Sequence, residues 1–259
     1  MRGIKSAIGI GVIAGKKELK LECLSKVTNV DISKCEEYLK NTKINIYDKK
    51  DSFIFDISIK MYTENDFVEG RIVDNHTNIV YLRKNDEIFI NQSLENKKTV
   101  SNLTDHNILN VADIYEFVEN VDVTKIQDLI EEQISCNMQI AKTGLENKFG
   151  ANIGSTLLKT YPTDVSVKAK AYAAAASDAR MSGCDLPVVI NNGSGNQGIT
   201  CSVPVIIYAE ELKVTHEKLI RALILSNLLT SHIKTGIGRL SAFCGAVAEG
   251  CAAGAAIAY

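Results

Sequence analysis

The most unusual stretch of the sequence is rich in glycine and in amide side chains. It runs Asn191-Asn-Gly-Ser-Gly-Asn-Gln-Gly198. Glycine permits positive φ angles and close backbone approach, and successive amides followed by a helix N-terminus bind anions. The stretch lacks the Lys-Ser/Thr pair of a P-loop and the spacing of a dinucleotide fingerprint. It therefore predicts a site for a carboxylate or a phosphate; the alternative is a tight, purely structural connection.

Polar side chains within and beyond this stretch could contact a bound anion. Ser194, Asn196 and Gln197 add hydrogen-bond donors and acceptors. The segment Ser231-His-Ile-Lys-Thr-Gly-Ile-Gly-Arg-Leu240 carries basic groups that bind carboxylates, although solvation at the surface is their ordinary role. His76, in a sheet-forming region, is either a ligand contact or a structural histidine. The residues predicted to bind substrate are Ser194, Gly195, Asn196, Gln197, His76, Lys234 and Arg239.

Three cysteines lie close to these segments in sequence. Cys201 follows the glycine-rich stretch, and Cys244 and Cys251 are seven residues apart, which places both thiols on one side of a helix. Grouped thiolates suit zinc or an iron–sulfur cluster, whereas single buried thiols act as small apolar side chains. The odd total of seven cysteines, scattered in sequence, argues against a disulfide scaffold and for a reducing cytoplasm. Core packing is the predicted role of Cys23, Cys35, Cys136 and Cys184.

Composition narrows the class of protein. The 259 residues suit one large or two modest domains, and the net charge of -2 gives no reason to expect nucleic acid or an anionic membrane as partner. The small-residue segment 241–258 resembles a membrane span at first sight. It contains Glu249 and lacks bulky apolar side chains, so a tightly packed internal helix is predicted.

Hydrophobic periodicity predicts the elements that position these groups. Residues 1–42 read as helices, the last of them capped by Asp31, and apolar residues then alternate from Lys43 to Asn91, which indicates a small antiparallel sheet. Later helical segments are predicted at 111–147, 155–181, from Pro204 to 211, 216–230 and 240–259. The predicted fold class is α+β: a mostly helical catalytic lobe with a small sheet domain inserted after the first helices. Its predicted parts are residues 1–42 (helical, catalytic lobe), 43–110 (sheet domain) and 111–259 (cysteine-bearing catalytic lobe).

Several motifs along the chain form a recognisable set. They are Ser177-Asp-Ala-Arg-Met-Ser-Gly183, Leu186-Pro-Val188, Asn192-Gly-Ser-Gly-Asn-Gln-Gly-Ile199, Ile233-Lys-Thr-Gly-Ile-Gly-Arg-Leu-Ser-Ala242, Phe243-Cys-Gly245 and Asn75-His-Thr-Asn-Ile79. Together they resemble the L-cysteine desulfidase family, which is related to the alpha chain of iron–sulfur L-serine dehydratases. The resemblance runs through nearly the whole chain, and the glycine-rich block is its most specific part.

The resemblance implies a chemistry and a cofactor. It implies a lyase that eliminates sulfide from L-cysteine, or water from L-serine, giving pyruvate and ammonia. It also implies a [4Fe–4S] cluster whose three cysteine ligands match Cys201, Cys244 and Cys251, with one iron left open as a Lewis acid. The related dehydratases place one ligand near Cys244 and others beyond the matched region. The turn at 194–197 would then hold the substrate carboxylate.

The resemblance also implies that the chain is shortened at both ends. Members of the family begin before the position that matches Met1, with a Gly-Cys-Thr-Glu-Pro segment carrying the proposed base, and continue beyond Tyr259 through a Cys-Asp-Gly-Ala segment. The catalytic base is therefore unassigned, and either a homo-oligomer or a complementing chain is compatible with this reading. Two rivals stay open: a non-catalytic remnant or subunit that needs a partner chain, and a zinc-dependent hydrolase, disfavoured because no His/Glu ligand motif accompanies the cysteines.

Overall fold

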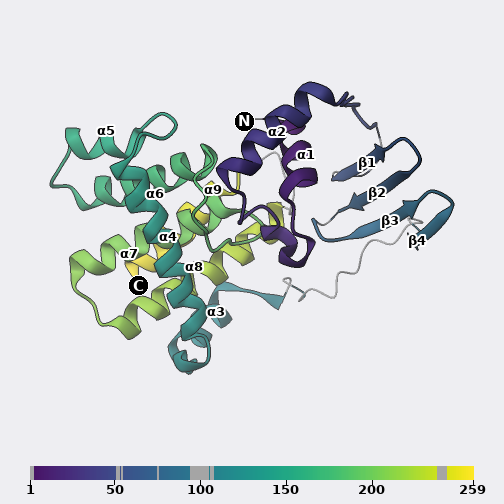
Figure 1. Cartoon of the computed structure of the whole chain (residues 1–259). Coiled ribbons are helices and arrows are strands. Elements are labelled where there is room, and N and C mark those ends of the chain that lie inside the picture. The colour runs from purple at the N-terminus through teal and green to yellow at the C-terminus, as the bar shows by residue number, and fades with distance from the viewer. Residues whose placement is uncertain are drawn as a thin grey trace. The chain divides into compact units, whose positions relative to one another are not determined.

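The chain forms two compact units, one from Met1 to Ser101 and one from Asn102 to Tyr259 (Figure 1). The computed structural model describes residues 3–50, 53, 55–74, 76–93, 105, 108–237 and 244–259. The regular structure of these residues consists of helices and one small antiparallel sheet. This confirms the predicted α+β class. The predicted three-part division at residues 42 and 110 stays a prediction.

The first unit begins with a pair of packed helices. α1 (Ile4–Ala14) and α2 (Asn29–Asn41) pack against each other, joined through a 3₁₀ helix at Lys17–Glu22. α2 is capped by Thr28, not by Asp31 as the sequence suggested. The Thr28 hydroxyl accepts the Asp31 backbone N–H, and the Asp31 carboxylate accepts the Thr28 backbone N–H. Asp31 was misplaced because it is the third helical residue of a capping box, where an acidic side chain resembles a cap.

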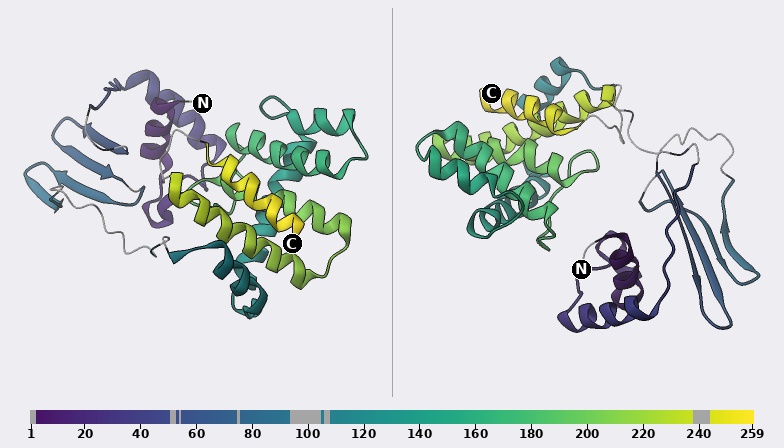
Figure 2. Two further views of the ribbon diagram at one scale, coloured as in Figure 1. Left: turned by 180° about the vertical axis from the view of Figure 1, so that it is seen from behind. Right: turned by 90° about the horizontal axis from the view of Figure 1, so that it is seen from above.

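The sheet of the first unit has four strands in sequence order, each antiparallel to the next (Figure 2). They are β1 (Asp56–Tyr62), β2 (Phe67–Val73), β3 (Ile79–Lys84) and β4 (Glu87–Asn91). Ile57 faces Ile72 and Met61 faces Val68 across β1 and β2, so the period-two apolar residues share one side. The predicted small antiparallel sheet is confirmed, but it begins at Asp56, and Ile44 and Ile46 lie outside any strand.

The second unit is helical (Figures 1 and 2). Its helices are α3 (Val111–Asn120), a 3₁₀ turn at Val123–Lys125, α4 (Gln127–Glu146), α5 (Ile153–Thr160), α6 (Val165–Met181), α7 (Gly195–Leu212), α8 (His216–Ile237) and α9 (Ala246–Ala258). The Ala-rich α6 packs on α4, α5 and α7, as its small side chains predict. A Cβ at Gly144 of α4 would lie 2.2 Å from the Ala175 carbonyl oxygen, so glycine is required at that crossing.

Helix α7 begins nine residues earlier than predicted. The sequence placed its start at Pro204, because proline favours the first helical turn. In the structure Pro204 lies inside α7, and the glycine-rich stretch itself forms the first turn from Gly195. The helix tolerates Pro204 because the residues on both sides of it are buried. Val203 is fully buried and Val205 nearly so, and their packing outweighs the one backbone hydrogen bond that proline cannot donate.

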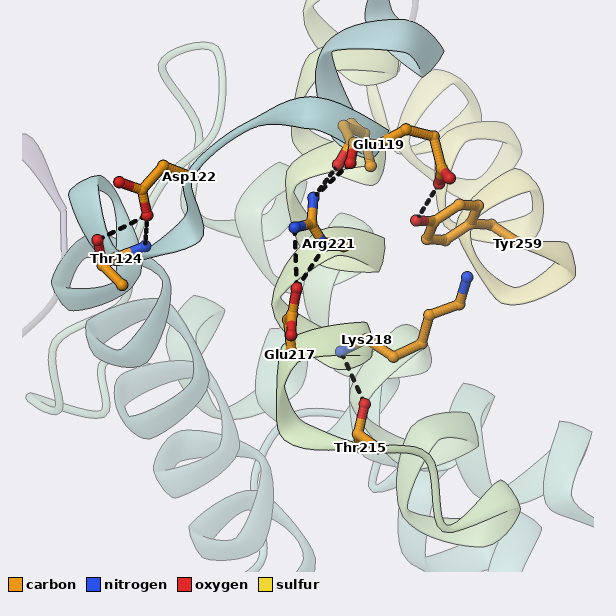
Figure 3. A network of polar contacts seen from close by, with 9 residues as sticks. Glu119, Asp122, Thr124, Thr215, Glu217, Lys218, Arg221 and Tyr259 are labelled. Carbon is orange, nitrogen blue, oxygen red and sulfur yellow. Dashed lines mark hydrogen bonds and ion pairs between the residues drawn. The ribbon is translucent and has the colours of Figure 1, made fainter.

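An arginine ties α8 to α3 (Figure 3). The Arg221 guanidinium donates to the Val118 and Glu119 carbonyl oxygens at the end of α3, and it pairs with Glu217 one turn earlier on α8. The Tyr259 hydroxyl, beyond α9, donates to the Glu119 carboxylate at 2.5 Å. Within the described residues, no helix combines the length and the apolar character that crossing a membrane requires.

Candidate functional site

The glycine-rich stretch forms a tight turn that leads into α7. Asn191 and Ser194 exchange backbone hydrogen bonds, and the residues between them, Asn192 and Gly193, have φ angles of 46° and 86°. Two positive φ angles in succession are typical of a type I′ turn, which favours Asn-Gly. The sequence Asn-Gly at this point therefore dictates the reversal that precedes the helix.

Two of the three glycines are required by packing. A Cβ at Gly195 would lie 2.3 Å from Nε of Arg180, and a Cβ at Gly198 would lie 2.0 Å from the Val189 carbonyl oxygen. A tight, purely structural connection would therefore explain why glycine stands at positions 195 and 198. It does not account for the polar side chains that follow the turn.

The first turn of α7 presents polar groups at its N-terminal end. Ser194 is the N-cap residue, but its side chain makes no capping hydrogen bond. Since the first backbone N–H groups of a helix have no intrahelical acceptor, they can bind an anion. The Asn196 side-chain oxygen accepts from Arg180 of α6 at 3.2 Å, so a guanidinium lies beside the same turn.

A cluster of three polar side chains, two of them buried, joins α7, α8 and α9. The Gln197 amide donates from its nitrogen to the Asn191 carbonyl oxygen at 3.1 Å and to the Glu249 carboxyl group at 3.3 Å. Its oxygen accepts from the Lys234 ammonium at 3.2 Å. Lys234 is 6% exposed and Glu249 is fully buried. Burial raises the pKa of Glu249.

Gly245 leaves room for this cluster. A Cβ at Gly245 would lie 2.0 Å from an amide atom of Gln197 and 2.9 Å from Nζ of Lys234. The backbone before α9 therefore closes directly over the Gln197–Lys234 contact. A side chain of any size at this position would displace it.

A second polar network surrounds the thiol of Cys201, one turn further along α7. Gln133 of α4 and Asn227 of α8 exchange amide hydrogen bonds at 3.1 and 2.8 Å, and Asn191 donates to the Asn227 side-chain oxygen at 2.8 Å. The Cys201 Sγ lies 3.3 Å from the Gly198 carbonyl oxygen and 3.6 Å from the Asn227 side-chain oxygen. Burial, and then the negative charge of Glu249, raise the pKa of Cys201 to about 12. The group is a protonated thiol that donates a hydrogen bond.

Asn137 of α4 ties the approach to the turn to α7. Its side-chain nitrogen donates to the carbonyl oxygens of Val189 and Gly198 and to the Ser202 hydroxyl, and its oxygen accepts the Val189 backbone N–H. Asn137 is fully buried. One amide side chain thus fixes both the segment before the turn and the first turn of α7 after it.

The structure brings part of the predicted substrate site together. The N-cap and first turn of α7 contain four of the predicted residues: Ser194, Gly195, Asn196 and Gln197. Lys234 contacts Gln197. His76 belongs to the first unit, where its ring lies 4.8 Å from that of Phe55. Arg239 lies outside the described residues.

The three predicted cysteine ligands are not gathered in the described part of the chain. Cys201 is fully buried, while Cys244 and Cys251 are exposed. The helical spacing argument fails for the last two because Cys244 precedes the first residue of α9. Among the residues that the structure describes, no group of three His, Cys, Asp or Glu side chains is placed to hold a metal ion. The ligand set Cys201, Cys244 and Cys251 therefore stays a prediction from the resemblance.

Sequence reasoning missed most of the buried polar network. The sequence assigns no role to Asn137, Gln133 or Asn227. Asn191 enters only as the first residue of the glycine-rich stretch, and Glu249 only as an argument against a membrane span. A carboxylic acid within a helix of small apolar residues was an available signal, because such a group is rarely buried without a purpose. The long-range amide pairs left no local pattern in the sequence.

A separate hollow of about 210 Å³ lies between the ends of α7, α8 and α9. Its walls are mostly apolar and include Val205, Leu212, Leu219 and Ile257. Lys218 and Tyr259 also line it, and the Lys218 Nζ lies 3.2 Å from the centroid of the Tyr259 ring; both side chains are drawn in Figure 3. The hollow is lined mostly by apolar side chains, whereas the Gln197 cluster contains a buried lysine and a buried glutamate. The Gln197 cluster is therefore the candidate site.

Comparison with known proteins adds family information. The family model described as serine dehydratase alpha chain matches residues 18–259. A UPF0597 protein of Desulfitobacterium hafniense is 48% identical over the whole chain, which covers 60% of that relative. UPF0597 proteins of Treponema denticola and Finegoldia magna are 43% and 44% identical, and the chain covers 61% and 62% of their lengths. The chain therefore spans about three fifths of these curated relatives. No solved structure matches significantly.

Proposed function

Because this chain belongs to the serine dehydratase alpha chain family, we propose that it supplies the amino-acid-binding site of a lyase acting on L-serine or L-cysteine. The products would be pyruvate and ammonia, together with water or sulfide. The observation that carries the proposal is the Lys234 ammonium. It is almost buried, it contacts the first turn of α7, and no carboxylate lies within ion-pair distance of it among the described residues.

These features suit a substrate carboxylate. A buried cation is costly without an anion, so Lys234 favours a negatively charged ligand. The unpaired N–H groups at the start of α7 add donors of the same kind. The proposed substrate-binding residues of the helical unit are therefore Ser194, Gly195, Asn196, Gln197 and Lys234. The roles of His76 and Arg239 stay predictions from the sequence. Holding the carboxylate orients the α-carbon for loss of its proton, and the enamine that follows elimination hydrolyses without further catalysis.

A [4Fe–4S] cluster remains the proposed cofactor on the strength of the resemblance. When bound, such a cluster supplies a Lewis acid for the leaving hydroxide or thiolate. The described residues do not gather three ligands for it, so the chain's own part in the proposal is confined to binding and orienting the substrate. The pattern of cysteine use supports a cytoplasmic location.

A second candidate is a subunit that acts only with a partner chain. It is supported by the description of the matching family as an alpha chain, which implies a companion chain. Under this proposal the amino-acid site is present, but the reaction requires residues supplied by another polypeptide. The zinc-dependent hydrolase is less favoured, because the described residues hold no suitable ligand group.

Calorimetry with L-serine, L-cysteine and D-serine, combined with an anaerobic pyruvate assay, tests these proposals. We expect the L-amino acids to bind more tightly than D-serine. Pyruvate release by the chain alone supports the lyase; binding without release supports the partner-dependent subunit. If neither L-amino acid binds and no pyruvate forms, both proposals are wrong.

Reconstitution tests the cofactor separately. After anaerobic incubation with iron and sulfide, a cluster would give visible thiolate-to-iron absorbance and stoichiometric bound iron. Cys244→Ala should abolish both signals, whereas Cys35→Ala, at a buried position in α2 of the first unit, should leave them unchanged. No bound iron in the unaltered chain would contradict the proposed cofactor for this polypeptide.

A further inference from the structure

The orientation of the Gln197 amide is determined by its surroundings. The Asn191 carbonyl oxygen can only accept a hydrogen bond, and the Glu249 oxygen facing Gln197 serves as an acceptor. Both therefore require the nitrogen of the Gln197 amide. The amide oxygen is left facing the Lys234 ammonium, at 3.2 Å. Glu249 thus reaches Lys234 through an intervening neutral group.

Lys234 keeps donors available in this arrangement. An ammonium has three N–H groups, and Lys234 uses one of them for Gln197. A direct Lys–Glu ion pair would neutralise the cation and occupy the ammonium. With a neutral amide between them, Lys234 is held in place while its charge remains available to a ligand.

Glu249 has no other structural partner that would account for it. It is fully buried on α9, and its second carboxyl oxygen has no hydrogen-bond partner in the described part of the chain. The Thr230 hydroxyl, one turn before Lys234 on α8, is likewise buried without a partner. Burying such groups costs stability, and an apolar side chain would fill the same space without that cost. Packing therefore does not explain why a glutamate stands here.

We propose that Glu249 is a positioning residue, which acts through the Gln197 amide to hold the Lys234 ammonium in place for the carboxylate of an amino-acid ligand. The identity of the ligand rests on the proposed function; the link from Glu249 to Lys234 does not. What Glu249 supplies is a hydrogen-bond acceptor. Glutamine at the same position would supply one too, whereas methionine, of similar size, would not.

The link is tested without ligand by NMR of the lysine ammonium groups in chain labelled with ¹⁵N-lysine. A buried, hydrogen-bonded ammonium exchanges slowly with water, and Lys234→Met identifies its signal by removing it. We expect Glu249→Met to shift or broaden the Lys234 signal, and Glu249→Gln to keep it near its original position. Glu211→Met, at an exposed glutamate in the last turn of α7, is the matched control and should change nothing. An unchanged Lys234 signal in Glu249→Met would overturn the proposal.

The purpose of the link is tested by comparing L-serine with L-serinamide, which lacks the carboxylate. In the unaltered chain we expect L-serine to bind at least about ten-fold more tightly than the amide, a difference worth about 1.4 kcal/mol. Glu249→Met should lose most of that preference, with the affinity for serinamide unchanged, and Glu249→Gln should restore it. Equal losses for both ligands, or the same loss in both variants, would overturn the positioning role.

The two experiments separate the possible failures. If L-serine does not bind the unaltered chain, the proposed function fails, and the NMR comparison still decides whether Glu249 holds Lys234. If L-serine binds and Glu249→Met leaves the preference for the carboxylate intact, the proposed function stands and this inference is wrong. Should Glu249→Met fail to fold, as judged by circular dichroism, Glu249→Leu, which likewise lacks the acceptor, replaces it.

Discussion

The two units stabilise their buried polar groups in different ways. In the sheet unit, the Asp56 carboxylate is almost covered and is paired with two cations, Arg71 at 2.6 Å and Lys49 at 2.8 Å. In the helical unit, Glu249 and Cys201 are fully buried, and the side chains that contact them are neutral amides: Gln197 for Glu249, and Gln133 and Asn227 for Cys201. The buried group is paired with opposite charge in one unit, and contacts uncharged groups in the other.

This contrast gives the two units opposite responses to pH. The Arg71 hydrogen bond lowers the pKa of Asp56 to about 2, so the folded state binds its proton less readily than the unfolded state, and the stabilisation is lost as the pH falls through that range. Burial raises the pKa values of Glu249 and Cys201. Their folded states hold protons more tightly, so stability is lost as the pH rises. Acid should open the sheet unit first, and alkali the helical unit.

The largest effect on the helical unit is expected from removing the Asn137 amide, which is fully buried and ties the segment before the turn to α7. Asn137→Ala removes four hydrogen bonds and leaves the Val189 N–H and carbonyl groups without their partner, while Ser202 and Gly198 keep the bond between them. We expect a loss of about 4 kcal/mol from the unfolding free energy of the helical unit, because each unsatisfied buried group costs about 1–3 kcal/mol. Urea denaturation followed by hydrogen exchange and mass spectrometry reports the two units separately. Asn147→Ala, which removes one exposed contact to Thr143, is the control, and equal losses in both variants would contradict the network's role.

At alkaline pH, the Cys201 thiol should make the stability of the helical unit depend on pH. Between pH 9 and pH 11 the buried Cys201 should cost the helical unit up to about 1.4 kcal/mol per pH unit, because its pKa is raised to about 12. Stability is therefore full below pH 9 and falls above it. Cys201→Ala should flatten this part of the stability curve. The comparison is with Cys251→Ala, an exposed thiol on α9; a curve that keeps its slope in Cys201→Ala would show that another group is responsible.

Acid pH tests the sheet unit. Asp56→Asn should lower its stability by about 1–2 kcal/mol at neutral pH, allowing for the partly exposed guanidinium. The difference between variant and unaltered chain should shrink as the pH falls toward 2, where Asp56 itself is half protonated, and disappear below it. Peptides from the helical unit should exchange at unchanged rates. Asp86→Asn, at a fully exposed carboxylate, is the control and should lose almost nothing at any pH.

The smallest effect is expected at the surface of the first unit. Thr28→Ala removes the hydroxyl that accepts the Asp31 backbone N–H at the start of α2. Amide exchange in the first turn of α2 should quicken roughly five-fold, the usual consequence of losing an N-cap. Thr28→Ser keeps a hydroxyl and should restore protection. An effect that spread beyond α2 would mean that the capping box stabilises more than one helix.

The sequence allowed the fold class to be predicted but not the polar network. Alternating apolar residues from Ile57 onward and helical periodicity after Val111 are local patterns, and local patterns determine element type. Gln133 and Asn227 are 94 positions apart, and Asn191 and Asn227 are 36 apart. No short-range pattern connects them, because their pairing follows from helix packing. For the same reason, spacing could not reveal that Cys244 lies outside α9.

The glycine-rich stretch shows both the strength and the weakness of motif reading. Its Asn-Gly pair correctly marks a turn with two positive φ angles. The same glycines suggested an anion site, yet Gly195 and Gly198 are explained by close packing against Arg180 and Val189. The groups that make this region chemically unusual, Lys234 and Glu249, come from two later helices. Their convergence is a property of the fold.

The hydrogen bond from Tyr259 to Glu119 provides an optical reporter for helix docking. The sequence contains nine tyrosines and no tryptophan, so tyrosine dominates its near-ultraviolet absorption. Burial, and then the Glu119 carboxylate, raise the pKa of Tyr259 to about 12. In a spectrophotometric titration its phenolate should therefore appear later than ordinary tyrosinate. An earlier appearance in a variant would reveal, without any label, that the segment beyond α9 has separated from α3.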